Sequence, residues 1–278
     1  MSKQLIEAAT TSSTRYLECM NSQVPSDKPA TSQQTVDAIV ESATRSAIPV
    51  RHGFIQSKSR TTPRAGPLAA FVSNGDRTGL LLYLLVLTKA SSEPWDVSLH
   101  SSVWARALGL PNPDSAAARG RVSKAWRRLA ERSLVERSRR NRYAVVSLLR
   151  EDGSGERYER PKQSFIQIPH ELWTAGPSPQ QRWYERLSLP ALTFLLIALR
   201  NADHFGLPAE RGPDYYGISA DTLTRGAREL RMTDLLKVDK ALITAPLAPS
   251  GLTAENRYTL RPPFGPHGTS SSATSRSR

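Results

Sequence analysis

The sequence predicts a mainly α fold with small β-hairpins (an α+β class), in which one unit of helices and a hairpin occurs twice. Two strongly apolar runs, 80–87 and 187–199, are far shorter than the ~20 residues of a membrane span and therefore indicate buried helices. Each run is followed by a polar helix with one apolar face and then by two segments of alternating polarity. The triplet Asn-Arg-Tyr recurs near the end of both units, at 141–143 and at 256–258.

The two ends of the chain lack the apolar residues that a core needs. We expect residues 1–67 to form a flexible N-terminal arm, since 1–35 are rich in Ser, Thr and Gln and the linker TTPRAGP closes the segment. The spacing of apolar residues in this arm allows one short amphipathic helix around Val36. Residues 265–278 are expected to be a disordered tail of low complexity.

The first unit is predicted over residues 68–150. Its elements are, in order, a buried helix at 78–92, a short strand at 97–100, a helix at 102–110 capped by Ser101, a longer helix at 115–134 and a hairpin that turns at Arg140–Asn141. The sequence PNPDS makes the turn between the later helices, because proline and aspartate favour turns and helix starts. The apolar stripe of the longer helix lies on one face, which predicts that the opposite face is exposed.

A connector at 151–164 leads to the second unit, which is predicted over residues 165–264. Its elements are a buried helix at 187–203, a short helix and turn at 213–219, a helix at 219–236 and two strands around a loop that contains PLAPSG. Both units therefore share one order, in which two helices joined by a turn precede a β-hairpin. That order defines a winged helix, so the sequence predicts two tandem winged-helix domains whose return strands carry Asn-Arg-Tyr.

The two units, which cover about residues 78–262, resemble tandem winged-helix DNA-binding proteins. That group includes two-domain plasmid replication initiators and many actinobacterial helix-turn-helix proteins of mobile elements. The phrases SLLREDGSGERY, LSLPALTFLLIAL and YGISADTLTRGARELR are similar to the actinobacterial type. The resemblance implies duplex DNA as the partner. One departure concerns rolling-circle initiators, which carry a His-hydrophobic-His motif and a nicking tyrosine. No such His pair occurs here, so an initiator of this kind would bind an origin without cutting it.

The excess of positive charge is concentrated in one part of the chain. The formal net charge is +13, and residues 51–150 hold 18 basic and 6 acidic side chains. A solvated basic surface is the simplest explanation, but a uniform surface would not concentrate charge in this way. Such clustering indicates a polyanionic partner, and duplex DNA is expected rather than a membrane.

The longer helix of the first unit supplies the main candidates for DNA contact. In a helix-turn-helix the second helix enters the major groove, where Arg and Ser can bond base edges. Ser115, Arg119 and Ser123 follow one another at helical spacing and are the candidates for base readout. Lys124, Arg127 and Arg128 come later in the helix and are expected to meet phosphates. Arg121 is a further candidate for DNA contact on this helix. Ordinary solvated helix charges are the alternative interpretation.

The first hairpin is also rich in arginine, with Arg137, Arg139, Arg140 and Arg142 as candidates. Wings commonly follow the DNA backbone or enter the minor groove, where the negative potential favours arginine. Arginine can equally serve to discourage edge pairing of an exposed hairpin.

The second unit has more balanced charges, and its candidates are therefore open to two interpretations. Its helix and wing provide Ser219, Thr222, Thr224, Arg225, Arg228, Lys237 and Lys240 as candidate DNA contacts. Asp221 near the helix start suits the helix dipole but repels phosphate when unpaired. The unit therefore either reads bases or packs against a protein partner.

No catalytic residue, cofactor or metal is expected, and the chain is not predicted to be an enzyme. Its histidines are scattered without metal-ligand spacing, at His52, His100, His170, His204 and His267. Neither a phosphate-binding glycine loop nor a Gly-x-Ser-x-Gly elbow occurs. Four tryptophans are expected in a core or an interface, namely Trp104, Trp126, Trp173 and Trp183.

We therefore expect a sequence-specific double-stranded DNA-binding protein, most simply a transcriptional regulator of a plasmid or mobile element. Two alternatives are a non-nicking replication initiator that binds origin repeats and a DNA-bound assembly adaptor whose second winged helix binds protein. A cytoplasmic, nucleoid-associated location is expected, because the polar start resembles no signal peptide and the single cysteine forms no internal disulfide. Further partners left open are a homodimer, through the helix near Val36 or through Trp173 and Trp183, and a protein bound by the second unit or the N-terminal arm.

Overall fold

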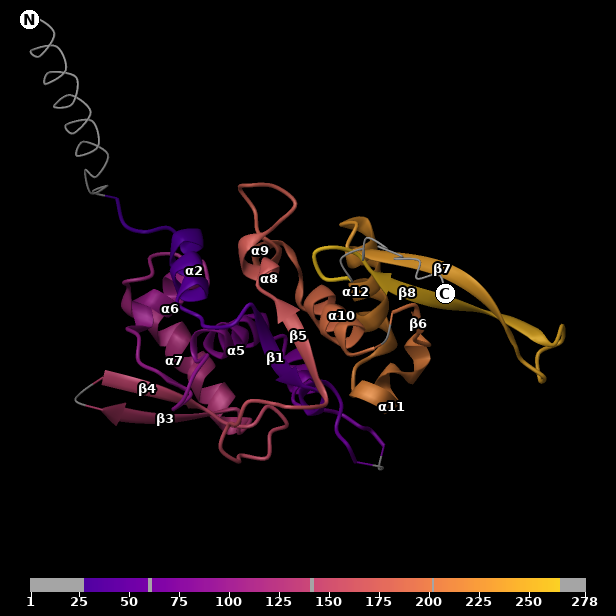
Figure 1. The fold of residues 1–278 in the computed structure, drawn as a ribbon, viewed down its shortest axis with the longest axis horizontal. Coiled ribbons are helices and arrows are strands. Elements are labelled where there is room, and N and C mark those ends of the chain that lie inside the picture. The colour runs from indigo at the N-terminus through magenta and orange to yellow at the C-terminus, as the bar shows by residue number, and fades with distance from the viewer. Residues whose placement is uncertain (1–27, 60–61, 141–142, 202, 266–278) are drawn as a thin grey trace, which may run out of the picture. The chain divides into compact units, whose positions relative to one another are not determined.

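Two stretches of the chain fold into the same succession of elements, the first repeat (residues 47–148) and the second repeat (residues 165–260) (Figure 1). The structure is a computed structural model, and it describes residues 28–59, 62–140, 143–201 and 203–265. Its elements are helices and short antiparallel strands, so the predicted α+β class with small hairpins is confirmed.

In each repeat a strand is followed by two short helices, a long buried helix, a two-residue strand, a short helix, a long polar helix and a hairpin. Helix α2 (Ser32–Glu41) precedes the first repeat, which comprises β1 (Ala47–Arg51), α3 (His52–Ile55), α4 (Leu68–Ser73), α5 (Arg77–Lys89), β2 (Asp96–Val97), α6 (Ser101–Ala107), α7 (Ala116–Glu131), β3 (Val135–Arg140) and β4 (Tyr143–Leu148). The second repeat comprises β5 (Phe165–Pro169), α8 (Glu171–Thr174), α9 (Trp183–Arg186), α10 (Leu189–Arg200), β6 (Phe205–Gly206), α11 (Gly212–Tyr216), α12 (Ala220–Met232), β7 (Leu236–Thr244) and β8 (Leu252–Leu260), with a 3-10 turn, η2 (Ala209–Arg211), before α11.

Three small antiparallel sheets join these elements. Each hairpin takes up the short strand of its own repeat, which gives the strand orders β2-β4-β3 and β6-β8-β7. The third sheet joins the two repeats, because β1 pairs with β5 from Ala47↔Pro169 to Arg51↔Phe165. The first residue of one strand thus pairs with the last residue of the other, as equivalent strands do about a two-fold axis.

The two apolar runs form the central helices that the sequence predicts. Ten of the thirteen residues of α5 and eight of the twelve residues of α10 are buried, so each helix is largely surrounded by the rest of the fold. Asp76 caps α5 by accepting a hydrogen bond from the Gly79 backbone N–H at 3.0 Å. Ser188 caps α10 in the same way, from the Ala191 N–H at 3.3 Å. These caps satisfy N–H groups that a helix start leaves unpaired.

The cap of α6 differs from the prediction of Ser101. His100 is the N-cap, and its Nδ1 accepts a hydrogen bond from the Ser102 backbone N–H at 3.3 Å. The same ring nitrogen lies 2.6 Å from the Ser102 hydroxyl. Ser101 is the first helical residue, because the imidazole supplies the acceptor that a serine hydroxyl would otherwise supply.

The N-terminal arm predicted over residues 1–67 is packed, not flexible, from α2 to α3. Residues 1–27 and 60–61 lie outside the described residues. Val36 and Ile39 of α2 are buried where this helix contacts α6 and α8. Strand β1 pairs along its whole length with β5. The partners of α2 and β1 include elements more than a hundred residues away, so local composition did not reveal this packing. Of the predicted C-terminal tail, residues 266–278 also lie outside the described residues.

The residues suggested for a dimer contact lie in the interior instead. Val36 and Trp173 are 0% exposed and Trp183 is 6% exposed, so these three side chains pack within the chain. Trp104 and Trp126 are buried as well, and their rings meet edge to face at 5.5 Å. Of the two predicted alternatives for the four tryptophans, a core or an interface, all four occupy the core.

The connector at 151–164 is anchored at both its start and its middle. Glu151 has a fully buried side chain that accepts hydrogen bonds from Arg51 at the end of β1. Burial raises the pKa of Glu151, although Arg51 opposes this effect. Tyr158 is buried and its ring meets Trp95 edge to face at 5.3 Å. The connector is therefore held to the fold at Glu151 and Tyr158, while most of its other residues are exposed.

The two Asn-Arg-Tyr triplets occupy different positions in their hairpins. Residues 141–142 lie outside the described residues, but Tyr143 pairs with Arg140 at the outer end of the first hairpin. Tyr258 instead pairs with Val238 near the base of the second hairpin. The duplicated hairpin predicted from the triplet is present, whereas the triplet itself does not mark equivalent positions.

Candidate nucleic-acid interface

The exposed side of α7 carries cations between its buried apolar positions. The apolar stripe predicted for this helix is buried, and Trp126 joins it. Arg121 and Lys124 are exposed, and among the described residues neither forms an ion pair. Ser123 is also exposed. This side of the helix is therefore free to meet an anionic partner.

Three further candidates on α7 are partly engaged within the chain. Ser115 is the N-cap, and its hydroxyl accepts a hydrogen bond from the Ala118 N–H at 3.1 Å. Arg119 is exposed and donates to the backbone carbonyl of Asp114. Arg127 is exposed and lies 3.8 Å from Glu131, a surface pair that is weak in water.

Arg128, which the sequence predicts as a phosphate contact, is engaged within the fold, although its side chain is 37% exposed. Its guanidinium donates two hydrogen bonds to the Asp76 carboxylate, at 2.9 and 2.6 Å. Arg132 donates a third to the same carboxylate at 2.7 Å. Burial alone would raise the pKa of Asp76, but these hydrogen bonds bring it below its usual value. Arg128 thus ties the end of α7 to the cap of α5.

The first hairpin adds arginines beside α7. Arg137 pairs with Val146 and Arg139 with Ala144, so these side chains share the sheet face of buried Val135. Both arginines are exposed and form no ion pair among the described residues. Arg140 lies on the other face and pairs with Asp96 at 2.7 Å. The remaining wing candidate, Arg142, lies outside the described residues.

A groove of about 540 Å³ separates α7 from this hairpin. Ser123 lines it from the helix, and Arg137 and Arg139 line it from β3. Trp104 lines it from α6 and Trp126 lines it from α7, and their rings make its interior aromatic. The structure therefore brings together candidates from two predicted elements, the helix and the wing, around one groove.

The second repeat presents fewer uncompensated cations. Arg225 pairs with Asp221 and Lys237 pairs with Asp239, both at 2.9 Å. Arg228 and Lys240 are exposed and form no ion pair among the described residues. Arg231, which was not among the candidates, is exposed and equally unpaired there.

Three hydroxyl candidates of the second repeat are engaged with the helix itself. Thr222, predicted as a DNA contact, is buried, and its hydroxyl accepts a hydrogen bond from the Ser219 hydroxyl at 2.9 Å. Ser219 is the N-cap of α12. Thr224 is exposed and donates to the Ala220 carbonyl at 2.9 Å. Thr222 is buried because the first turn of α12 packs against the core.

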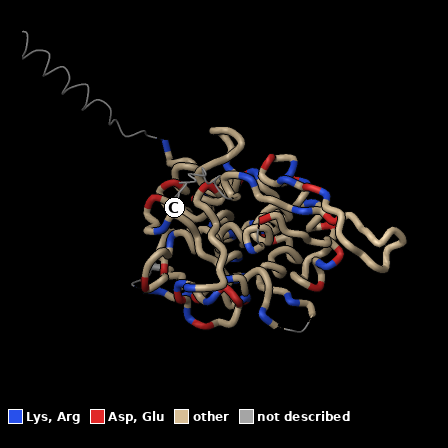
Figure 2. Tube along the Cα trace, turned by 45° about the vertical axis from the view of Figure 1, so that its right-hand side comes forward, with Lys and Arg blue, Asp and Glu red and all other residues tan. Residues whose placement is uncertain are grey.

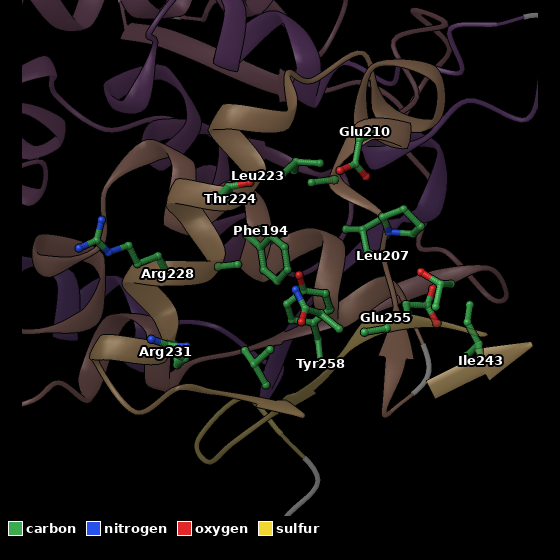
Figure 3. Close-up of a pocket in the computed structure, with 17 residues that line it drawn as sticks. Phe194, Leu207, Glu210, Leu223, Thr224, Arg228, Arg231, Ile243, Glu255 and Tyr258 are labelled. Carbon is green, nitrogen blue, oxygen red and sulfur yellow. The ribbon is translucent and has the colours of Figure 1, made fainter. Parts of the chain in front are cut away.

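A second groove, of about 750 Å³, lies between α12 and the hairpin β7–β8 (Figure 3). It corresponds in position to the groove of the first repeat. Tyr258, which pairs with β6, lines this groove, and Val146, which pairs with β2, lines the groove of the first repeat. Arg228 and Arg231 border it on the side of α12. Glu210 and Glu255 border it on the opposite side. Sequence reasoning missed this groove, since no single segment signals it.

The outer half of the hairpin β7–β8 carries no charge at all. Residues 241–254 contain no Asp, Glu, Lys or Arg, and Figure 2 shows the protruding hairpin without basic or acidic positions there. Leu242, Leu247 and Leu252 are exposed on it, at 73%, 102% and 46%. This surface contrasts with the arginine-rich first hairpin.

Comparisons with known proteins found no matching family model, no matching curated protein and no matching solved structure. Within the described ranges, no group of three His, Cys, Asp or Glu side chains is placed to hold a metal ion. The described helices also include none that is both long and apolar enough to cross a bilayer.

Proposed function

We propose that the chain is a sequence-specific double-stranded DNA-binding protein with two winged-helix domains, one in each repeat. The order of two helices and a hairpin in both repeats supports the winged-helix interpretation. The observation that carries the function is the groove between α7 and the first hairpin. Arg137 and Arg139, which have no acidic partner among the described residues, line it from the strand, and Ser123 lines it from the helix; Arg121 and Lys124 add exposed cations elsewhere on α7.

Base and phosphate contacts divide along these elements. Arg119 and Ser123 are exposed on α7, and arginine and serine there can bond base edges in the major groove. Lys124, Arg127 and the wing arginines contact phosphates, which fixes the register of the protein on the duplex. Arg128 takes no part, since Asp76 holds it.

Salt dependence of duplex binding tests this proposal. If about seven phosphates are neutralised, the slope of log K against log salt is about −6. The double variant Arg137→Ala/Arg139→Ala should flatten the slope by about two, because two phosphate contacts are lost. Arg157→Ala/Arg160→Ala, two exposed arginines of the connector, is the matched control. A wild-type slope near zero would refute DNA binding.

The biological role that we propose is transcriptional regulation of a plasmid or mobile element. The alternative is a replication initiator that binds origin repeats without nicking, which uses the same contacts. Footprinting on the DNA around the gene separates the two. One protected operator over a promoter supports a regulator, whereas several protected direct repeats beside an AT-rich segment support an initiator.

A third candidate, an assembly adaptor, is favoured by the second hairpin. Its uncharged outer half exposes three leucines, and exposed apolar patches usually mark protein contacts. The variant Leu242→Asp/Leu247→Asp should then abolish self-association or partner capture while duplex binding persists. Sedimentation of wild type and variant at several concentrations, with and without duplex, measures the first effect. A wild type that stays monomeric on DNA and draws no partner argues against the adaptor.

A further inference from the structure

The groove beneath the second hairpin differs from its counterpart because one large side chain is missing. Leu134 and Leu235 are equivalent residues just before the two hairpins. Eight residues before Leu134 stands Trp126 of α7, and eight residues before Leu235 stands Ala227 of α12.

That alanine, Ala227, lines the second groove directly. In the first repeat the paired rings of Trp104 and Trp126 fill the corresponding space. The groove of the second repeat is accordingly larger, at about 750 Å³ against about 540 Å³. Ligand pockets in proteins typically measure about 300–1,000 Å³, so the second groove has room for a small molecule.

The lining of this groove is aromatic and apolar in its interior. The rings of Phe194 and Tyr258 meet edge to face at 5.2 Å, and Figure 3 shows them in the middle of the groove. Leu207 and Val238 add apolar surface. A planar aromatic group buried here would replace the ring packing that the tryptophans provide in the first repeat.

The rim of the groove is polar and has two different sides. Arg228 and Arg231 stand on α12, and neither has an ion pair among the described residues. On the opposite side Glu255 is bound by Arg257 at 2.7 Å, and Glu210 is exposed. The arginine side attracts an anion, while the glutamate side repels one, so an anionic ligand has one preferred orientation.

We propose that this groove binds a small planar aromatic molecule that carries an anionic group. The ring lies against Phe194 and Tyr258, and the anion is held by Arg228 and Arg231. An aromatic acid and a nucleotide share this chemistry. The site joins α12 to its hairpin, so a bound ligand makes DNA binding by the second repeat dependent on a metabolite. Ligand binding itself does not require DNA.

Fluorescence titration with 8-anilinonaphthalene-1-sulfonate, an aromatic anion, tests the site on the full chain. Ala227→Trp, which restores the tryptophan of the first repeat, should abolish saturable binding. Arg228→Ala/Arg231→Ala should weaken it by roughly tenfold or more, because charge-assisted hydrogen bonds to the anion are lost. Arg157→Ala/Arg160→Ala is the matched control, and Leu247→Ser checks for dye bound at the exposed hairpin tip; both should bind as wild type does.

Circular dichroism shows whether Ala227→Trp folds. If that variant does not fold, the dye affinity of Arg228→Ala/Arg231→Ala tests the proposed site. Unchanged dye affinity in the arginine variant, or loss of binding in Leu247→Ser, would overturn the proposal. Competition then identifies the source of the ligand. Displacement by 2-naphthoate supports an aromatic acid and displacement by thymidine monophosphate supports a nucleotide. Displacement by neither would also overturn it.

Discussion

Glu229 binds Ser188 at the place where Arg128 binds Asp76 in the first repeat. Arg128 precedes Leu129, and Glu229 precedes Leu230. The carbonyls of these two leucines accept equivalent hydrogen bonds, from Leu134 and from Leu235, just before each hairpin. Asp76 and Ser188 each cap a central helix. The Ser188 N–H donates to Glu229 at 3.0 Å, and its hydroxyl donates as well. In both repeats the long polar helix therefore bonds the residue that caps the central helix. The polar helix donates through Arg128 in the first repeat and accepts through Glu229 in the second.

Removal of the Asp76 carboxylate should destabilise the fold. Asp76→Ala leaves Arg132, whose side chain is 12% exposed, without its anion and leaves the first turn of α5 uncapped. We expect a loss of about 3 kcal/mol in the free energy of unfolding, measured by urea denaturation. Glu131→Ala removes an exposed acid from the same region and should change stability by less than about 0.5 kcal/mol. Equal effects of the two variants would contradict this role.

The contribution of Asp76 should depend on pH in a defined direction. Its pKa is below the usual value in the folded state, so the native protein binds fewer protons at this site than the unfolded chain does. The stabilisation is therefore fully present above about pH 4 and is lost as pH falls through the folded pKa. Unfolding free energies of wild type and Asp76→Asn should converge at acid pH. A difference that stays constant with pH would show that charge plays no part.

Arg119 and Arg139 should affect DNA binding in different ways. Arg119→Ala on α7 should cost about 1–3 kcal/mol on the preferred duplex and relax the preference at one base position. Arg139→Ala on the wing should weaken all duplexes alike and lower the salt slope by about one. Competition assays with a target duplex and a scrambled duplex separate the two effects. Loss of non-specific affinity alone in both variants would remove Arg119 from base readout.

Much of the fold, and less of the candidate site, follows from local sequence. The leucine run of α5 and the apolar stripe of α7 predict buried faces because their periodicity is set within one helix. The pairing of β1 with β5 depends on residues far apart, and no local pattern contains it. Exposed arginines on α7 were found, but which of them is held by Asp76 depends on the packing of α5 against α7.

Thr222 illustrates the same limit and leads to a test. Thr222 stands three residues after the N-cap Ser219, as the buried Ala118 stands three residues after the N-cap Ser115, and it turns inward in the same way. Thr222→Val should therefore lower stability by about 1 kcal/mol through the lost hydrogen bond with Ser219. Duplex affinity, measured by fluorescence anisotropy at a temperature where the variant is folded, should equal that of wild type. A specific loss on the target duplex would return Thr222 to the interface.

The packing between the repeats makes DNA spacing critical if both winged helices read one duplex. Strand β1 pairs with β5, and Arg77 of the first repeat donates to the carbonyl of Leu187 before α10 at 2.9 Å. The two long polar helices then cannot be repositioned independently.

Inserting about five base pairs between the half-sites rotates them by half a turn and should remove most of the specific affinity. The same insertion outside the footprint is the control and should have no effect. If affinity survives the insertion between the half-sites, the second repeat does not read DNA. Its uncharged hairpin then becomes the stronger argument for a protein partner.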